Sequence, residues 1–282
     1  MVRIITDSAA DFEAREYEQL HVSCIPLTVT FGTQEFQENV NLTKDQFYQL
    51  LADSESLPKT AQPSPQLLLD LFESADAAGD EAIYITLSSA LSGTYQNALV
   101  TRSLADSDLC HVVDSLNATG GQRQIVEHAV RLRDSGKNAA EIIAGIEHIR
   151  GRIVLYACID TLEYLYKGGR ISHTTYKLGT LANIKPIICV EPDGRISIPA
   201  KAMGMRKGMD FMCKRVEALP PDEEFPLYVM YTNQRSVAET LAARLESTGI
   251  KVPDSHIIQV GAGIGSHIGP NACGLVYVKK EE

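Results

Sequence analysis

The sequence predicts an α/β protein of two domains, on three observations. Its 282 residues are too many for one ordinary core and suit two domains of roughly 100–150 residues. Up to about residue 150, short apolar runs alternate with amphipathic helical stretches, as in a parallel sheet covered by helices. Beyond Gly151 the apolar runs are longer and clear turns join them. We therefore expect an N-terminal three-layer α/β/α domain with a parallel sheet over residues 1–150. A C-terminal two-layer α/β domain with a mixed six-stranded sheet should cover residues 151–282.

The first predicted domain alternates strands and helices from its first residues. Residues 2–6 and 22–31 have the apolar content of strands, and residues 42–51 have helical spacing. Ser64 and Pro65 supply an N-cap and a first-turn proline for the helix that follows. Further helices are expected at residues 66–77, 94–104, 122–135 and 139–150, and further strands at residues 82–87 and 110–114.

The second predicted domain contains six strands and two helices. The turn formed by residues 191–194, Glu-Pro-Asp-Gly, predicts a hairpin, because proline fixes φ and glycine tolerates a positive φ. The two helices would cover one face of the sheet. The strands are expected at residues 153–159, 186–190, 195–200, 227–231, 256–261 and 273–278, and the helices at residues 203–218 and 236–247.

Composition and charge exclude several classes of function. With 44% hydrophobic and 22% charged residues, the chain has the composition of a soluble globular protein. The formal net charge of −10 argues against a non-specific binder of nucleic acid or of anionic membranes, since these use a basic field. No stretch approaches the ~18 apolar residues of a spanning helix, so we expect no stable membrane insertion. No secretory signal is visible at the N-terminus.

Cysteine and histidine usage indicates a cytoplasmic protein without a metal site. The six cysteines are scattered through apolar segments with no CxxC pair, which favours buried, inert thiols in a reducing compartment. The histidines at positions 21, 111, 128 and 148 have no companion at metal-ligand spacing. We therefore expect no metal.

Polar residues directly after strands are the first candidates for a site, because ligands of open α/β sheets lie beyond the strand ends. Asp7 follows the first strand, where it either caps the next turn or binds a neighbouring loop. Thr60 lies in a loop that prolines make rigid. Residues 88–95 form a small-residue turn before a helix, which predicts free N–H groups and an anion site. The turn lacks the lysine of a phosphate loop and GxGxxG spacing, so a carboxylate or a small oxyanion fits better than a nucleoside triphosphate.

Two glycine-containing segments of the second domain add further candidates. Residues 261–270 hold alternating glycines, then His267 and a Gly-Pro pair, which predicts a tight turn where something approaches the backbone closely. This density of glycine favours a ligand or catalytic role for His267. Lys167 and Arg170 flank a Gly-Gly pair and are either solvated charges or neutralise a phosphoryl group. The same holds, more weakly, for Arg206 and Lys207.

Taken together, six ordered motifs resemble the DegV family, nearly from end to end. They are TDSAAD, the KTxQPS loop, LSSxLSGTYQNA, VDS near residue 114, TLEYLxKGGRIS and a final HIGP. The family includes the fatty-acid-binding subunits of the bacterial fatty acid kinase. The resemblance implies a two-domain fold with an acyl chain buried in a tunnel and its carboxyl group at the domain interface.

The resemblance also implies roles for particular residues. Thr60, Ser92 and His267 would hold the carboxylate, and hydroxyls and an imidazole can do so without the permanent charge of an arginine pair. Arg170 and Lys167 would stabilise phosphoryl charge or dock the kinase. The supporting residues of the ligand-site loops are Ala61, Gly93, Thr94 and Ser266.

The implied partners are a long-chain fatty acid and the ATP-binding subunit of the kinase. That subunit would carry ATP and Mg, so this chain is expected to bind no cofactor and to be no enzyme on its own. The product, an acyl phosphate, would enter phospholipid metabolism. No nucleic-acid partner is expected.

This sequence departs from the family pattern at three places. Ala61 stands where many relatives carry serine, Asn271 stands where glycine is common, and residues 117–119, Asn-Ala-Thr, replace a serine-containing run. The first departure removes a possible donor beside Thr60. The other two would reshape loops or tune the preference for the acyl chain.

Three alternative functions stay open at this point. A hydrolase using Ser92 and His267 would need a third residue to orient the imidazole and an oxyanion hole, and no GxSxG elbow is present. A protein like dihydroxyacetone kinase would form a hemiaminal between its histidine and a carbonyl substrate. A lipid-carrying regulatory interaction module would need no catalytic group.

Overall fold

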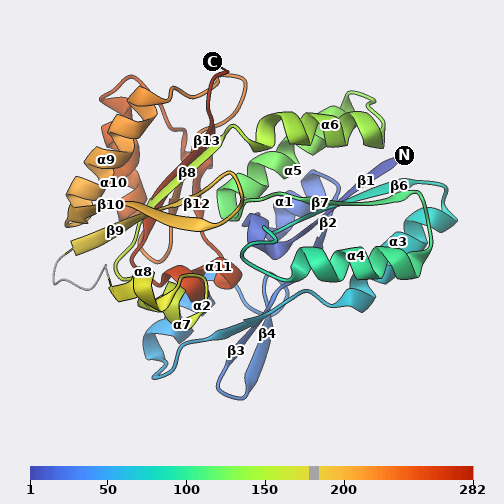
Figure 1. Cartoon of the computed structure of the whole chain (residues 1–282), viewed down its shortest axis with the longest axis horizontal. Coiled ribbons are helices and arrows are strands. Elements are labelled where there is room, and N and C mark those ends of the chain that lie inside the picture. The colour runs from blue at the N-terminus through green and yellow to red at the C-terminus, as the bar shows by residue number, and fades with distance from the viewer. Residues whose placement is uncertain (178–183, 282) are drawn as a thin grey trace.

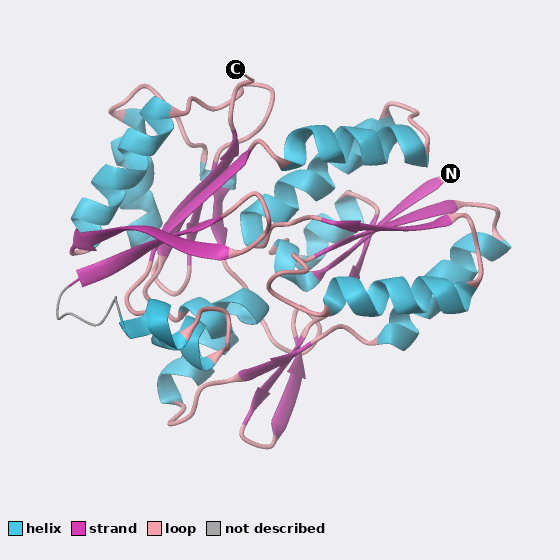
Figure 2. Cartoon of the chain, viewed as in Figure 1, coloured by secondary structure: helices cyan, strands magenta, loops and turns pink. Residues whose placement is uncertain are grey.

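The computed structural model describes residues 1–177 and 184–281 and arranges their strands in two large sheets and one small sheet (Figure 1). The first large sheet is parallel, has the order β2-β1-β6-β7, and uses only residues of the first half. The second has the order β10-β9-β8-β13-β11-β12 and is mixed. Figure 2 shows the two sheets as separate bodies with helices packed around each. The predicted fold class is therefore confirmed.

The parallel sheet is covered by helices on both faces because its strands are apolar on both sides. In β6 (Glu81–Thr86), Ile83 and Ile85 pack toward one layer of helices, whereas Ala82 and Tyr84 pack toward the other. The first layer contains α1 (Ala14–Gln19), α5 (Thr119–Asp134) and α6 (Ala139–Arg150), and the second contains α3 (Pro65–Ala77) and α4 (Thr94–Ala105). The other strands are β1 (Val2–Asp7), β2 (Val22–Ile25) and β7 (Cys110–Asp114).

One face of the mixed sheet is covered by two long helices, whereas the opposite face is covered only in part. In β8 (Ile153–Cys158), Tyr156 and Cys158 pack beneath α9 (Met205–Ala218) and α10 (Arg235–Glu246), while Leu155 and Ala157 lie on the opposite face. The predicted hairpin at residues 191–194 joins β9 and β10, with Gly194 at a φ of 81°. The remaining strands are β9 (Ile184–Val190), β10 (Ile196–Met203), β11 (Tyr228–Tyr231), β12 (Ile257–Gln259) and β13 (Cys273–Val278).

The prediction of one strand over residues 22–31 was wrong. Pro26 has no N–H to continue a ladder, and the segment divides there. β2 stays in the parallel sheet, whereas β3 (Thr28–Phe31) joins β4 (Gln34–Gln37) and β5 (Lys59–Ala61) in a small antiparallel sheet. Figure 1 shows the β3–β4 hairpin extending away from both large sheets. Thr60, expected in a loop, therefore lies in an edge strand.

The prediction of a tight turn over residues 261–270 was also wrong, because helix α11 (Ala262–Ile268) occupies this segment. Close approach to the backbone was correctly expected: a Cβ on Gly265 would lie 2.6 Å from the Tyr48 hydroxyl. Helix α2 (Lys44–Asp53), which carries Tyr48, begins two residues later than expected, after an N-cap at Thr43. Several short elements were not predicted. They are helices α1, α7 (Glu163–Lys167) and α8 (His173–Lys177), strand β4, and the 3-10 turns Ser8–Ala10 and Asp254–His256.

Two segments tie the halves of the molecule together. Helix α5 contacts strands of both large sheets, and Figure 1 shows it between them. Helix α11 comes from the second half of the chain but packs against α2, β3 and β5 of the first half. The predicted boundary at residue 150 lies at the last residue of α6, just before the turn that leads to β8. Within the described residues, no helix has the length and apolar character needed to cross a membrane.

Candidate functional site

A cavity of about 570 Å³ lies between one face of the mixed sheet, the face opposite α9 and α10, and the loops of the first half. Its walls are mainly aliphatic, with Leu155 and Ala157 from β8 and Ile188 from β9 on one side. Leu27 and Leu87 face it from the first half. Both the volume and the apolar lining are typical of a site for a small organic ligand. The face of the sheet opposite α9 and α10 is therefore the floor of a binding cavity.

Thr60 and His267 meet at the wall of this cavity. The Thr60 hydroxyl lies 2.9 Å from Nε2 of His267, although the two residues are 207 positions apart in the chain. Burial, and the nearby charge of Arg170, lower the pKa of His267 to about 4. The imidazole is therefore neutral near pH 7 and offers one donor and one acceptor. Its Nδ1 atom is buried and has no hydrogen-bond partner among the described residues.

Glycines in two of the motifs allow this position of the imidazole. A Cβ on Gly168, in the segment Lys-Gly-Gly-Arg, would lie only 2.2 Å from Nδ1 of His267. Gly269 adopts a φ of 79°, and a Cβ there would lie 2.7 Å from the Tyr164 ring. The two motifs are therefore in direct contact, and α7 packs against α11.

The small-residue turn before α4 brings Ser92 to the same cavity, but not in the way that we expected. Most of its backbone N–H groups are already used: those of Ser89 to Ser92 are donated to Asp114 or to atoms of Ser88. The Ser92 hydroxyl lies 2.9 Å from that of Thr94, and Ser92 lines the cavity. The expected row of free N–H donors over residues 89–92 is therefore absent, and the hydroxyl is the donor that Ser92 offers.

The predicted supporting residues divide into two groups. Ala61 and Gly93 line the cavity. Gly93 lies against the Gln62 side chain, because a Cβ there would be 2.3 Å from Nε2 of Gln62. Thr94 and Ser266 are buried outside the cavity lining, and the Ser266 hydroxyl donates to the Ala262 carbonyl within α11. These two stabilise local structure.

The two cations beside the Gly-Gly pair lie in different surroundings. Arg170 is half-buried at the cavity and donates to the carbonyl oxygens of Leu91 and Gly168. No carboxylate pairs with it among the described residues, and burial lowers its pKa. Lys167 is exposed and forms an ion pair of 2.5 Å with Glu163, away from the cavity lining. Of these two cations, Arg170 therefore brings a positive charge to the cavity and Lys167 does not.

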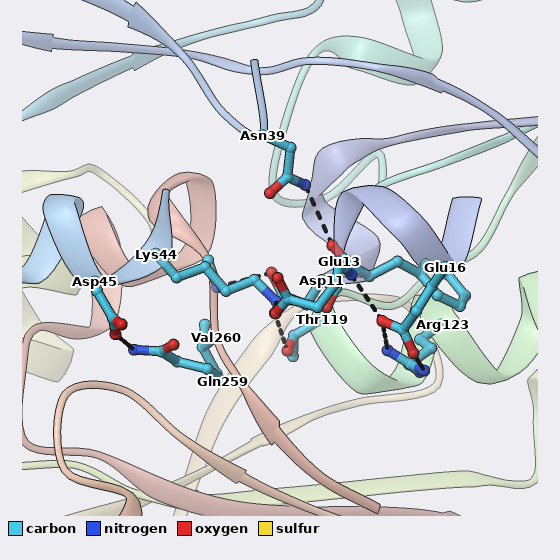
Figure 3. Close-up of polar contacts among 12 residues, drawn as sticks. Asp11, Glu13, Glu16, Asn39, Lys44, Asp45, Thr119, Arg123, Gln259 and Val260 are labelled. Carbon is cyan, nitrogen blue, oxygen red and sulfur yellow. Dashed lines mark hydrogen bonds and ion pairs between the residues drawn. The ribbon is translucent and has the colours of Figure 1, made fainter. Parts of the chain in front are cut away.

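A buried acidic network that the sequence did not predict supports the cavity wall, and Figure 3 shows its Asp11 side chain beside Thr119. The Asp11 carboxylate accepts from the Thr119 hydroxyl and from the Gly261 N–H, and the Glu38 carboxylate accepts from Gly263 N–H and from the Ser8 hydroxyl. Asp11 belongs to the first of the six motifs, but nothing in the sequence signals that Glu38 is buried.

Asp7 fulfils both of the roles left open for it. Its Oδ1 accepts from the Ala9 N–H and caps the following 3-10 turn, and its Oδ2 accepts from the Leu87 N–H at 2.8 Å in a neighbouring loop. Burial raises the pKa of Asp7 to about 6. Asp7 therefore supports the segment that carries Leu87 to the cavity.

The remaining sequence features lie outside the cavity or serve its walls. Asn271 is exposed at the surface, where its Nδ2 atom lies 3.4 Å from Oδ2 of Asp160. Ala118 and Thr119, in contrast, line the cavity. Six free cysteines are present, and burial raises the pKa of Cys24 and of Cys158 to about 12. No cluster of three or more His, Cys, Asp or Glu side chains suited to a metal is found in the part of the chain that the structure describes.

Comparison with known proteins identifies relatives over the whole chain. Residues 1–280 match the family described as "Uncharacterised protein, DegV family COG1307". A DegV domain-containing protein of Caldanaerobacter subterraneus subsp. tengcongensis is 30% identical over 280 residues, which cover 99% of each chain. Another, from Clostridium perfringens, is 31% identical over 284 residues and covers 98% of this chain and 96% of its own.

Solved structures with the same fold are described as fatty-acid-binding proteins. A stearic acid-binding protein from Eubacterium ventriosum superposes with a TM-score of 0.89 at 25% identity, covering 99% of both chains. A DegV family protein from Thermus thermophilus, described by its fatty acid binding, gives a TM-score of 0.89 at 26% identity and also covers 99% of both. The family match from end to end and the shared fold lead to one conclusion: this chain belongs to the DegV family.

Proposed function

We propose that this protein binds a long-chain fatty acid and presents its carboxylate to a partner kinase, which phosphorylates it to an acyl phosphate. The observation that carries the proposal is the cavity, whose aliphatic walls end at the contact between Thr60 and His267. The stearic acid-binding protein of Eubacterium ventriosum and the DegV family protein of Thermus thermophilus, described by its fatty acid binding, support the first half of the proposal.

The acyl chain would lie along the aliphatic walls. Each methylene removed from water contributes about 0.8 kcal/mol, so the chain supplies most of the affinity and the polar end fixes its orientation. Leu27, Leu155, Ile188 and Met230 offer such surface from both halves of the molecule. The ligand would thereby bridge the two halves.

The carboxylate would accept hydrogen bonds from Thr60, Ser92 and His267. The pKa of about 4 keeps the imidazole neutral, so the acid would be held by hydrogen bonds rather than by an imidazolium ion pair. The imidazole also has an atom, Nδ1, that lacks a partner among the described residues. Such a set of donors orients a carboxylate and leaves one of its oxygens free to attack a phosphoryl group.

Arg170 would stabilise the charge of the incoming phosphoryl group. Its guanidinium is half-buried at the cavity and has no carboxylate partner among the described side chains. In phosphoryl transfer, positioning and charge stabilisation supply nearly all of the catalysis. ATP and Mg would come with the partner kinase. Lys167, exposed and paired with Glu163, is better placed for contact with that partner than for contact with the acid.

Native mass spectrometry of the protein purified from an expression host tests the first half of the proposal. We expect an adduct with the mass of a fatty acid, which denaturation releases. A clean apo mass together with esterase turnover would instead favour the hydrolase that Ser92 and His267 could form. That alternative has little support, because the nitrogen that a third residue would orient, Nδ1 of His267, has no partner among the described residues.

The second half of the proposal needs the kinase. A fatty acid kinase ATP-binding subunit should form acyl phosphate from the loaded protein in the presence of ATP and Mg. A bound fatty acid that no such kinase phosphorylates would point instead to a lipid-carrying regulatory module.

A further inference from the structure

Helix α11 carries His267 near its last turn, and two buried carboxylates hold the other end of this helix. Gly261 donates its N–H to Oδ1 of Asp11 at 2.9 Å, and Gly263 donates to Oε1 of Glu38 at 3.2 Å. Both acidic side chains come from the first half of the chain and are almost fully buried. The placement of α11 against the first half therefore depends on these two groups.

The alternating glycines of α11 make room for the carboxylates. A Cβ on Gly261 would lie 2.1 Å from Oε1 of Glu38 and 2.9 Å from Oδ1 of Asp11. A Cβ on Gly263 would meet the Leu27 side chain at 2.5 Å and Oε2 of Glu38 at 3.2 Å. Glycine is unfavourable within helices. Its repetition here is explained by the close approach of these side chains, which no larger residue permits.

The same two carboxylates also hold two other walls of the cavity. The second oxygen of Asp11 accepts from the hydroxyl of Thr119, a cavity-lining residue at the start of α5. Glu38 accepts from the Ser8 hydroxyl, which in turn accepts the N–H of Leu27, another cavity-lining residue. The Asp11 and Glu38 side chains thus hold three cavity-lining segments, which are α11, the start of α5 and the segment around Leu27.

Backbone strain at Thr119 is a second and independent observation. Thr119 adopts a φ of 49°, a conformation that β-branched residues rarely adopt. Strain of this kind persists only where the surroundings impose it, and it gathers at functional sites. The surroundings here are Asp11 and the Met230 sulfur, which lies 3.6 Å from the Thr119 hydroxyl and also lines the cavity.

We infer that Asp11 and Glu38 are positioning residues for fatty-acid binding, which hold α11 with His267, the start of α5 and the Leu27 segment in the arrangement that accepts the ligand. Neither carboxylate lines the cavity. They act through the N–H groups and hydroxyls that they accept. The inference rests on the proposed function and adds to it the residues that set the geometry of its site.

Asp11→Asn and Glu38→Gln test the inference with little change in shape. Each amide keeps one acceptor but turns an NH₂ donor toward a hydroxyl that is itself donating. In Glu38→Gln the Ser8 hydroxyl, which also accepts the N–H of Leu27, would lose the acceptor for its own hydrogen. The matched control is Glu127→Gln. Glu127 has a partly buried carboxyl group that joins Arg123 to the Tyr228 hydroxyl, and none of these three residues lines the cavity.

Two measurements on delipidated protein separate positioning from general stability. The first is the affinity for stearate, from displacement of bound cis-parinarate, which should fall about tenfold in Asp11→Asn and Glu38→Gln but not in Glu127→Gln. The second is the ¹⁵N NMR signal of the His267 ring without ligand. It should move or broaden in the first two variants and stay in place in the control.

Thr119 provides a second test should the acidic variants fail to fold. Thr119→Val removes only the hydroxyl and should lower stearate affinity, whereas Thr119→Ser keeps the hydroxyl and should restore it. If wild-type protein binds stearate and all these variants bind equally well with an unmoved His267 signal, the positioning role is refuted and the proposed function stands. If wild-type protein binds no fatty acid, the proposed function itself fails.

Discussion

The two ends of helix α11 hold polar groups in opposite states. At its start, the N–H groups of Gly261 and Gly263 are donated to two buried carboxylates, whose remaining oxygens accept hydroxyl groups. At its end, Nδ1 of His267 is buried and lacks a partner in the described part of the chain, and the neighbouring Arg170 lacks a carboxylate there. One short helix therefore joins two different regions. We call the first saturated, because each of its carboxylate oxygens accepts a hydrogen bond, and the second unsaturated, because an imidazole nitrogen there has no partner among the described residues.

This difference separates the polar groups that hold the fold together from those that are available to a ligand. An unpaired buried polar atom costs about 1–3 kcal/mol, so a folded protein keeps one where something else relieves the cost. An anionic ligand at the His267 end would do so, whereas each carboxylate oxygen of Asp11 and Glu38 already accepts a hydrogen bond from the protein. Substitutions at the His267 end should change binding and phosphoryl transfer directly. Those at the other end should change stability and its pH dependence, and should change binding through the placement of α11.

The largest expected effect concerns Arg170, on the unsaturated side. Arg170→Ala should lower the rate of acyl phosphate formation with an added kinase subunit by about a thousandfold, as for other arginines that stabilise a transferring phosphoryl group. The fatty acid should stay bound, as native mass spectrometry would show. Arg235→Ala serves as a control, because Arg235 lies on α10, where it pairs with Glu239 of the same helix and with Asp254. A variant that keeps its turnover would exclude Arg170 from the transfer step.

A smaller effect is expected on the saturated side, from the pH dependence of stability. Burial, and then the charge of Asp11, raise the pKa of Glu38 from 4.5 to about 7. A raised pKa means that Glu38 stabilises the fold fully below pH 4.5 and loses this contribution as pH rises through 7. Between pH 5 and pH 8, wild-type protein should lose about 2 kcal/mol of unfolding free energy relative to Glu38→Gln. The charged or titratable groups that face Glu38 are Asp11, Lys44, Tyr17, Cys24 and Tyr48.

Urea unfolding of both proteins at the two pH values measures this difference. Glu127→Gln is the matched control, because the Glu127 carboxyl group accepts hydrogen bonds from Arg123 and Tyr228 and holds neither α11 nor the Leu27 segment. A gap between wild-type protein and Glu38→Gln that is the same at both pH values would contradict the burial of an ionisable Glu38 in the native state.

The contrast between the two ends of α11 also shows what the sequence could reveal. Strands β7 and β13 and helix α6 were predicted with the same ends that the structure gives them, because their apolar spacing and flanking turns are local signals. Helix α11 was mistaken for a turn, since four of the residues between 261 and 269 are glycines and glycine has low helix propensity. Only packing against Tyr48 and the two carboxylates explains this helix.

The candidate site was predictable only in part for the same reason. Thr60, Ser92 and His267 were singled out by motif, and the structure brings all three to one cavity. Asp11 and Glu38 were not singled out, because their partners Gly261 and Gly263 lie 250 and 225 positions away. An acidic side chain with no nearby partner in sequence is expected at the surface, and only the fold shows that these two are buried.

The smallest expected effect belongs to His267 itself. His267→Ala removes one of three donors, so fatty-acid affinity should fall about tenfold, and acyl phosphate formation by an added kinase should weaken with it. The free energy of unfolding should change by less than about 1 kcal/mol, because the substitution also removes a buried atom without a partner. Fluorescent displacement and urea unfolding measure the two effects, with His148→Ala at an exposed position as the control. If His267→Ala lost stability but kept its affinity and turnover, His267 would belong with the architecture of α11, and the carboxylate would have to bind elsewhere.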